Sequence, residues 1–247
     1  MEKINMPEEP IETVYDYFEL ADNAKSKKEE LLYIEKALEL EPDNLDALRR
    51  KADICDKDLH TFLQSLESLI DKGNNQMTEE GYFKDCMGDF WGVLETRPYM
   101  RLRHCYLIML LSAGMMTRAM QEGEELLKLC ENDNLGVRYI LMNIYAFSEN
   151  EKKMQALYEK YHCEDNSQML FIFVVLYYKL YNFEKAKRYL ETLCQTNKDA
   201  KKVLKSVGQR KFYQLYDEMS PYGYRPNTAD EIIMEITHNR FLFSLNG

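Results

Sequence analysis

Glycine and proline are scarce in this sequence of 247 residues, with 10 and 6 occurrences. A chain with few helix-breaking residues, and with abundant Leu, Glu, Lys and Met, favours helix along its whole length. The sequence also lacks a Gly- or Ser-rich stretch that would indicate a flexible linker. We therefore predict an all-α fold and a single domain over residues 1–247, a length at which a sizeable core can be buried.

The motifs that usually accompany catalysis are missing as well. The sequence has no phosphate-binding loop, no dinucleotide fingerprint and no serine elbow. Its four histidines do not show metal-ligand spacing, and its six cysteines include no C-x-x-C pair. We expect a protein that is not an enzyme and that binds neither a metal nor another cofactor.

Long apolar runs are also absent. The longest, Met169–Tyr178, is about half of the length that a membrane-spanning helix requires. The opening residues MEKINMPEEP lack the apolar centre of a signal peptide. Scattered cysteines without paired spacing fit reduced thiols. These features predict a cytoplasmic protein without a membrane segment.

Charge is unevenly distributed. Residues 1–100 hold 24 acids and 12 bases, a net charge of −12, whereas residues 101–247 hold 18 acids and 20 bases, a net charge of +2. An acidic first part repels nucleic acid and anionic membranes. Solvated helix faces give the same pattern, and we favour that interpretation.

Apolar residues recur every three or four positions, as in amphipathic helices. One such stripe consists of Leu31, Ile34, Ala37 and Leu38, with the helix cap Ser26 before it. Further along, we expect a helix over Leu59–Asp71 that stops at residues 73–75, where the sequence is Gly-Asn-Asn. We expect one long helix over Met77–Leu94, with Gly81 and Gly88 as weak points. A capping box from Thr228 to Glu231 predicts a last helix that ends near Arg240.

The string KALELEPDNLDAL resembles the end of one tetratricopeptide repeat and the start of the next. Gly114 and Ala119 are spaced like the turn glycine and the small packing residue of such a repeat, and Ala186 follows Ala119 after 67 residues, about two repeats. The resemblance implies a right-handed solenoid of helical hairpins. Its expected parts are N-terminal hairpins at 11–97, central repeats at 98–195 and C-terminal capping helices at 196–247.

Two stretches depart from the amphipathic pattern because charged and aromatic residues are concentrated in them. The first, DFWGVLETRPYMRLR, spans Asp89–Arg103, and the second, NDNLGVRY, spans Asn132–Tyr139. Over roughly residues 12–195, the chain resembles bacterial tetratricopeptide-like proteins related to the suppressor-of-tumorigenicity family, which carry both blocks. It differs from them at Cys130 and Glu131, where a proline is expected. The resemblance implies a helical-repeat scaffold with no assigned catalytic activity.

The arginines of these blocks allow two interpretations. Acids lie between them, which favours a buried ion-pair network that locks neighbouring helices together. A clamp for the carboxylate of an acidic peptide is the alternative, because the guanidinium fork suits that ligand. We favour the structural joint. The residues assigned to it are Trp91, Glu95, Arg97, Arg101, Asp133, Asn134 and Arg138.

A solenoid of helical hairpins predicts a protein–protein interaction scaffold, in which the first helix of each hairpin lines a concave groove for a peptide or a partner helix. The first helices are expected at Asn44–Asp56, Tyr99–Ala113, Leu135–Phe147 and Gln168–Leu180. The residues expected to contact the partner are Arg103, Tyr106, Asn143 and Tyr177.

The alternative function is a regulatory adaptor whose basic C-terminal segment contacts DNA or RNA. That segment includes Lys201, Lys202 and Lys205, and clustered lysines can neutralise phosphates. The overall pI of about 5.1 counts against it. We therefore expect the partner to be a protein or a peptide and not a nucleic acid.

Overall fold

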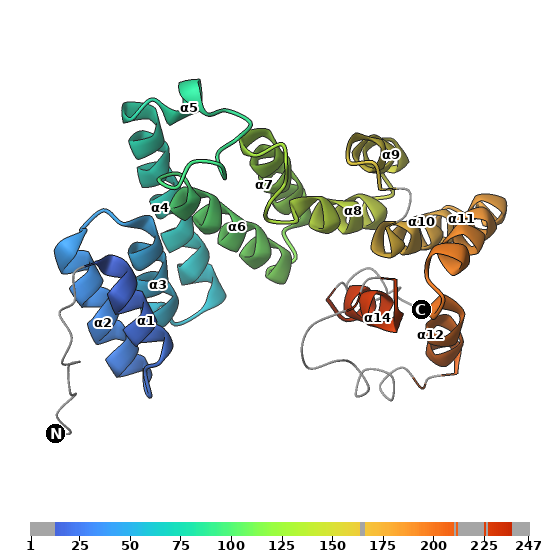
Figure 1. Cartoon of the computed structure of the whole chain (residues 1–247), viewed down its shortest axis with the longest axis horizontal. Coiled ribbons are helices and arrows are strands. Elements are labelled where there is room, and N and C mark those ends of the chain that lie inside the picture. Colours follow the sequence, from blue (N-terminus) through green and yellow to red (C-terminus); the bar gives the residue numbers. More distant parts are fainter. Residues whose placement is uncertain (1–12, 164–165, 210, 212–224, 226, 239–247) are drawn as a thin grey trace. The chain divides into compact units, whose positions relative to one another are not determined.

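The computed structural model describes residues 13–163, 166–209, 211, 225 and 227–238. Within these residues the protein consists of helices and their connections, with no strand. Consecutive helices pack against one another in neighbouring pairs (Figure 1). The all-α prediction is confirmed.

The protein divides into two compact units, Met1–Leu135 and Gly136–Gly247. The boundary falls inside the second motif block, immediately before Gly136. That glycine has a left-handed φ of +69° and stands at the N-cap of the next helix. A new run of helices therefore begins at the boundary.

The helices described in the first unit are α1 (Val14–Asp22), α2 (Lys27–Leu40), α3 (Leu45–Cys55), α4 (Leu59–Glu79), α5 (Tyr82–Asp85), α6 (Arg97–Ser112) and α7 (Met116–Leu129). Side-chain caps fix several of their starts. Asn44 accepts a hydrogen bond from the backbone N–H of Ala47 at 3.1 Å, and Ser26 accepts one from that of Glu29 at 3.2 Å. The expected cap at Ser26 is thus present.

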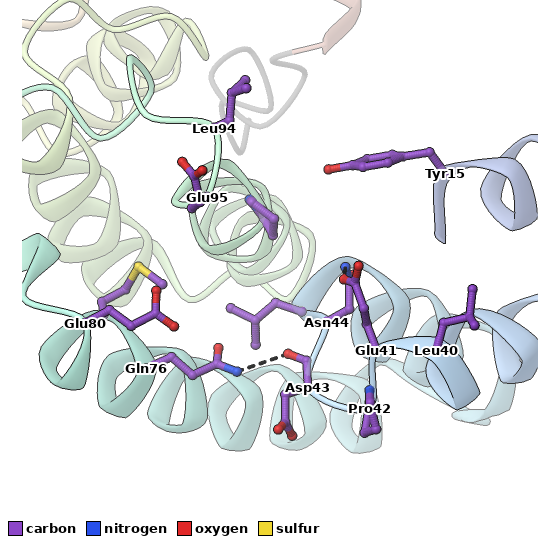
Figure 2. Close-up of a pocket in the computed structure, with 13 residues that line it drawn as sticks. Tyr15, Leu40, Glu41, Pro42, Asp43, Asn44, Gln76, Glu80, Leu94 and Glu95 are labelled. Atoms are coloured by element: carbon purple, nitrogen blue, oxygen red, sulfur yellow. Dashed lines mark hydrogen bonds between the residues drawn. The ribbon is translucent and has the colours of Figure 1, made fainter. Parts of the chain in front are cut away.

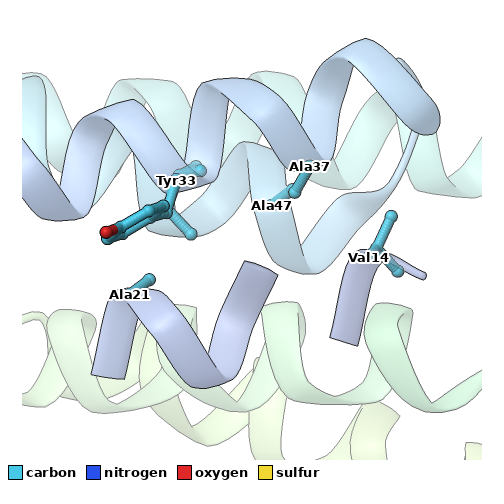
Figure 3. Close-up of a cluster of buried hydrophobic side chains, with 6 residues drawn as sticks. Val14, Ala21, Tyr33, Ala37 and Ala47 are labelled. Carbon is cyan, nitrogen blue, oxygen red and sulfur yellow. The ribbon is translucent and has the colours of Figure 1, made fainter. Parts of the chain in front are cut away.

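The apolar stripe of α2 packs between α1 and α3 (Figure 3). Ile34 and Ala37 of that stripe are fully buried, together with Ala47 of α3. Alanines at these positions let the helix axes approach closely because only a methyl group separates the backbones. Tyr33 and Val14 fill the remaining space of this cluster.

Helix α4 runs through residues 73–75 without a break, so the predicted stop there is wrong. Gly73 is buried against Tyr99 of α6, and a Cβ at Gly73 would lie 2.6 Å from Cδ2 of the Tyr99 ring. The Tyr99 hydroxyl donates a hydrogen bond to Oδ1 of Asn74 at 2.6 Å. This glycine therefore permits two helices to pack closely and does not end one.

The long helix expected over Met77–Leu94 is also absent. Gly81 and Gly88 have φ angles of +81° and +94°, a conformation that glycine adopts at little cost. Only the single turn of α5 forms between them. The two expected weak points are thus complete breaks. Helix α6 then starts at Arg97, two residues before the expected start at Tyr99, with Pro98 in its first turn.

The helices described in the second unit are α8 (Val137–Phe147), α9 (Glu151–Lys160), α10 (Ser167–Lys179), α11 (Phe183–Thr196), α12 (Ala200–Gly208) and α14 (Ala229–His238). The aromatic core of this unit centres on Phe173. Its ring stacks on that of Tyr189 with centroids 4.5 Å apart and meets Tyr158 edge-on at 5.0 Å. The expected last helix is present as α14, while its predicted end near Arg240 lies outside the described residues.

Candidate partner-binding surfaces

The start of the first motif block is bonded through its backbone to the end of α7 in the first unit. The N–H of Phe90 donates to the carbonyl of Leu129 at 2.9 Å, and the N–H of Glu131 donates to the carbonyl of Gly88 at 2.8 Å. Asp89 and Cys130 thereby form an antiparallel bridge. The start of the first block is thus held against the residues just before the second block.

The next residues of the first block are held by side-chain contacts with one another. The buried hydroxyl of Thr96 donates to the carbonyls of Phe90 and Val93. Arg97 donates from Nε to the carbonyl of Trp91 at 2.9 Å, and its guanidinium lies 5.4 Å from the centre of the Trp91 ring. The conformation of residues 90–97 is therefore defined by contacts within the block.

Arg101 pairs with an acid outside the two blocks. Its guanidinium forms an ion pair with Asp46 of α3, with Nε 3.0 Å from Oδ1. Glu95, which we assigned to the joint, is exposed and lines a pocket. The acidic partner of Arg101 thus comes from a helix that is distant in sequence.

The remaining residues of the predicted joint lie in the second block. Asp133 is buried and has a φ of +52°. Asn134 is exposed, and its Oδ1 lies 3.3 Å from Sγ of Cys130. Arg138 belongs to the second unit, where its guanidinium stacks on the rings of Tyr139 and Tyr161 at 4.7 and 5.2 Å.

Arg103, expected to contact a partner, lies inside the first unit. It forms two hydrogen bonds with Glu122 of α7, at 2.6 Å from Nε and 2.9 Å from Nη2, and donates a third to the Tyr99 hydroxyl at 3.1 Å. Only 12% of its side chain is exposed. Burial opposes its charged form, but the hydrogen bonds and charge of Glu122 outweigh this effect and raise the pKa of Arg103 above its usual value.

The two tyrosines of the predicted groove are also buried, each with its hydroxyl on a carboxylate. Tyr106 donates to Glu67 at 2.9 Å, and Tyr177 donates to Glu151 at 2.9 Å. Burial and the bond to Glu67 raise the pKa of Tyr106 to about 12. The guanidinium of Arg118, together with Tyr106, lowers the pKa of Glu67. Both tyrosines thus have partners within the chain, and their role in binding stays a prediction.

Asn143, the fourth predicted contact residue, is 1% exposed on α8. Its Nδ2 donates to the carbonyl of Tyr139 at 2.9 Å and to Oε1 of Glu235 at 2.5 Å. Glu235 belongs to α14, near the other end of the second unit's sequence. The asparagine that we expected to hold a ligand therefore contacts a helix of its own chain.

The lysines of the predicted nucleic-acid segment all belong to α12. Lys201, Lys202 and Lys205 are exposed, while Ala200 and Val203 of the same helix are fully buried. They form the polar face of an amphipathic helix. Contact with nucleic acid through this face stays a prediction.

A pocket of about 600 Å³ opens in the first unit (Figure 2). We call it the acidic pocket. It lies between α1, the α2–α3 turn, the end of α4 and the segment before α6. Its lining residues are Tyr15, Leu40, Glu41, Pro42, Asp43, Asn44, Leu45, Gln76, Met77, Glu80, Leu94, Glu95 and Pro98. A hydrogen bond of 3.0 Å from Nε2 of Gln76 to the carbonyl of Asp43 ties α4 to the turn.

The acidic pocket combines exposed apolar side chains with negative charge. Tyr15, Leu40 and Leu94 are 63%, 51% and 65% exposed. Four of the described lining residues are acids and none is a lysine or an arginine. Asp43 already pairs with Lys72 at 2.5 Å. The arrangement suits a ligand with an apolar side chain flanked by positive charge.

The acidic pocket was not predicted from the sequence. One signal for it was available, because Leu40 lies off the apolar stripe of α2 and therefore faces away from the core that the stripe builds. Leu94 gave no comparable signal, since the expected helix over Met77–Leu94 would have placed it on a helix face. Its exposure results from the breaks at Gly81 and Gly88.

The chain matches no protein-family model and no curated protein. No helix in the described ranges is long and apolar enough to cross a membrane. Among the same residues, no cluster of three or more His, Cys, Asp or Glu side chains is arranged to hold a metal ion.

Proposed function

We propose that this protein is a non-enzymatic scaffold that binds a basic, partly apolar segment of another protein in the acidic pocket. One observation carries the proposal. Exposed Tyr15, Leu40 and Leu94 share the pocket with four carboxylates, and its described lining has no basic side chain. An apolar surface rimmed by charge of one sign is typical of a recognition site.

The apolar side chains supply a driving force for binding. Tyr15 and Leu94 each lose contact with water when a partner covers them, which contributes about 25 cal/mol per Å² of buried apolar surface. A pocket of about 600 Å³ has the size that accommodates a few side chains of a ligand. We therefore expect one or two large apolar residues of the partner to enter it.

The carboxylates supply selectivity. Glu80 and Glu95 line the pocket on the side that faces Tyr15 and Leu40 (Figure 2), and a lysine or arginine next to the apolar anchor would reach them. Rim charges of this kind raise the association rate and exclude partners of the same sign more than they add affinity. The preference for basic segments should therefore weaken as the salt concentration rises.

The wider architecture is consistent with such a scaffold. Packing of helices in neighbouring pairs and the resemblance of KALELEPDNLDAL to a repeat junction support a tetratricopeptide-like, right-handed solenoid. The proposed binding residues differ from those expected at the first helices. Arg103, Tyr106 and Tyr177 are engaged by Glu122, Glu67 and Glu151, whereas the acidic pocket offers exposed groups.

The experiment is a selection of displayed random 12-residue peptides on the immobilised full-length protein, followed by fluorescence anisotropy with the selected peptides. We expect enrichment of sequences with Leu, Phe or Met next to Lys or Arg. Leu94→Asp and Glu95→Lys should each weaken binding at least tenfold, about 1.4 kcal/mol or more. Both residues are exposed, so these changes should leave folding intact.

Met115→Asp is the matched control, because Met115 is 38% exposed in the same unit and does not line the pocket. This variant should bind the selected peptides like the wild type. Peptides without basic enrichment, or equal affinities for the wild type and Leu94→Asp, would show that the pocket is not the binding site.

A further inference from the structure

Helix α14 contacts the first helices of two hairpins in the second unit, α10 by packing and α8 through a hydrogen bond. It packs against α10 and α12, and lies beside them in Figure 1. Its Glu235 accepts the hydrogen bond of Asn143 on α8. We call the surface that α8, α10 and α12 present to α14 the covered face. It corresponds to the groove side that the sequence predicts for a bound peptide or partner helix.

The start of α14 is tied to this face by polar contacts. Nδ2 of Asn197 donates to the carbonyl of Thr228 at 2.8 Å, and the N–H of Ala229 donates to Oδ2 of Asp199 at 3.2 Å. The hydroxyl of Ser167 donates to Oδ1 of Asn227 at 3.0 Å. Asn197 and Ser167 are fully buried. These contacts set the position and direction of the helix, as polar groups do at a specific recognition site.

The docked helix is acidic. Its sequence, ADEIIMEITH, contains three carboxylates and no lysine or arginine. Ile232 and Ile233 are buried to 0% and 1% exposure, and Glu235 to 4%. The neighbouring α12 has the opposite character, with three lysines and no acid in AKKVLKSVG. An acidic amphipathic helix is thus the ligand chemistry that the covered face already accommodates.

We propose that the covered face is a binding site for acidic amphipathic helices of other proteins, and that α14 fills it as a ligand belonging to the chain itself. A partner helix enters by replacing α14, with two adjacent β-branched residues in place of Ile232 and Ile233. A carboxylate three positions after the first of these reaches Asn143. The site belongs to the second unit and is independent of the acidic pocket in the first.

Replacement has a physical basis in Glu235, which is buried beside the two isoleucines. A buried carboxylate weakens an association that apolar area would otherwise favour. Asp230 and Glu231 are also buried, but they are bonded within their own segment, to Arg225 and to the N–H of Asn227. Because α14 belongs to the same chain as the covered face, it competes through its high local concentration, so a free helix binds well only when α14 is weakened.

Exposed Lys201, Lys202 and Lys205 have a role in this arrangement. Positive charge on the exposed side of α12 attracts an acidic helix over distances of about a Debye length. The same lysines would attract nucleic acid. The acidic helix docked against α12 favours a protein ligand over that alternative.

The test uses the full-length protein and a fluorescein-labelled peptide with the sequence of residues 225–238. In the double variant Ile232→Asp and Ile233→Asp, α14 leaves the covered face. We expect this variant to bind the peptide at least tenfold more tightly than the wild type. Adding Asn143→Ala should lower its affinity again. A peptide that carries the same two aspartates should bind neither protein.

Equal binding by the wild type and the double variant would overturn the proposal, and so would binding of a single-stranded oligonucleotide without binding of the peptide. If the double variant loses its helical circular dichroism signal, the wild type is titrated with unlabelled peptide while hydrogen exchange is followed. Faster exchange in α14, with α10 unchanged, supports replacement, and unchanged exchange in α14 overturns it. Leu94→Asp should not alter either result, which separates this site from the acidic pocket.

Discussion

Arg103 of α6 and Glu122 of α7 face each other through two parallel hydrogen bonds of 2.6 and 2.9 Å, with side chains only 12% and 10% exposed. A buried pair of this kind gains little over an apolar pair of the same size, because both charges lose their hydration. Removal of one partner is far more costly, since it leaves the other charge buried alone. Arg103 is therefore a residue on which the packing of α6 against α7 depends.

Arg103→Ala should reduce the free energy of unfolding by about 3–5 kcal/mol, measured by denaturant titration. The control is Lys128→Ala, which removes an exposed ion pair with Glu125 on α7 and should cost less than about 1 kcal/mol. The double variant Arg103→Met and Glu122→Leu should recover most of the loss, because neither charge then remains buried. Similar losses for Arg103→Ala and Lys128→Ala would contradict a structural role for the pair.

Gly73→Ala tests the close contact between α4 and α6. Alanine favours helix over glycine by about 1 kcal/mol, so the substitution would stabilise an unobstructed helix. Here the new Cβ would lie 2.6 Å from Cδ2 of Tyr99, and the Tyr99 hydroxyl is held by Asn74 and Arg103. Because the ring cannot move freely, overpacking of about 1–3 kcal/mol should dominate and lower the melting temperature.

Gly208→Ala is the control for this substitution. Apart from its chain neighbours and the backbone of its own helix, no heavy atom of the described residues lies within 4 Å of the position of a Cβ at Gly208. The change should leave the melting temperature equal or slightly higher. A gain in stability from Gly73→Ala as well would mean that Tyr99 can shift, and that Gly73 is not needed for the approach of the two helices.

These glycines show where inference from sequence succeeds and where it fails. Helix type follows from the apolar period, and Gly81 and Gly88 were expected as weak points because glycine adopts positive φ angles. Gly73 is needed for a different reason. It leaves room for the ring of Tyr99, which comes from another helix and lies 26 residues further along the sequence. A local pattern carries no information about which distant side chain will cross it.

The candidate sites were less predictable for the same reason. The sequence shows that Arg101 and Arg103 need acidic partners, but Asp46 and Glu122 become those partners only when α3 and α7 pack beside α6. Glu95 was closer in sequence and is exposed. Asn143 was recognised as an unusual polar residue on an apolar helix, whereas its contact with Glu235 spans 92 residues. Long-range pairing of this kind is decided by the tertiary fold.

Substitution of the buried tyrosines tests whether peptides bind in the acidic pocket or in the groove that the sequence predicts. Tyr177→Phe removes one hydrogen bond to Glu151, which Lys185 still contacts at 2.7 Å. The free energy of unfolding should fall by about 1 kcal/mol, and Tyr106→Phe should behave similarly at Glu67. Binding of peptides selected on the wild type should stay unchanged in both variants. A tenfold loss of binding without a loss of stability would instead place the ligand at these tyrosines.

Docking of α14 should depend on pH through Glu235. Burial raises the pKa of this carboxyl from 4.5 to about 7, and the hydrogen bond from Asn143 opposes the rise. When α14 leaves the covered face, the pKa of Glu235 returns towards 4.5. Between about pH 4.5 and pH 7, Glu235 is therefore protonated to a greater extent in the docked helix than in the undocked one. Docking is therefore strongest below about pH 4.5 and weakens as the pH rises to about 7, at about 1.4 kcal/mol per pH unit.

Hydrogen exchange of α14 between pH 5 and pH 8, corrected for the intrinsic exchange rate, measures this effect. Protection should fall with rising pH in the wild type. Glu235→Gln keeps an oxygen that accepts from Asn143 but cannot ionise, so its protection should be nearly independent of pH. Glu184→Gln, at an exposed carboxyl of α11 in the same unit, should follow the wild type. If the protection of α14 in Glu235→Gln still falls with pH as in the wild type, a group other than Glu235 controls the pH dependence of docking, because this variant has no ionisable group at residue 235.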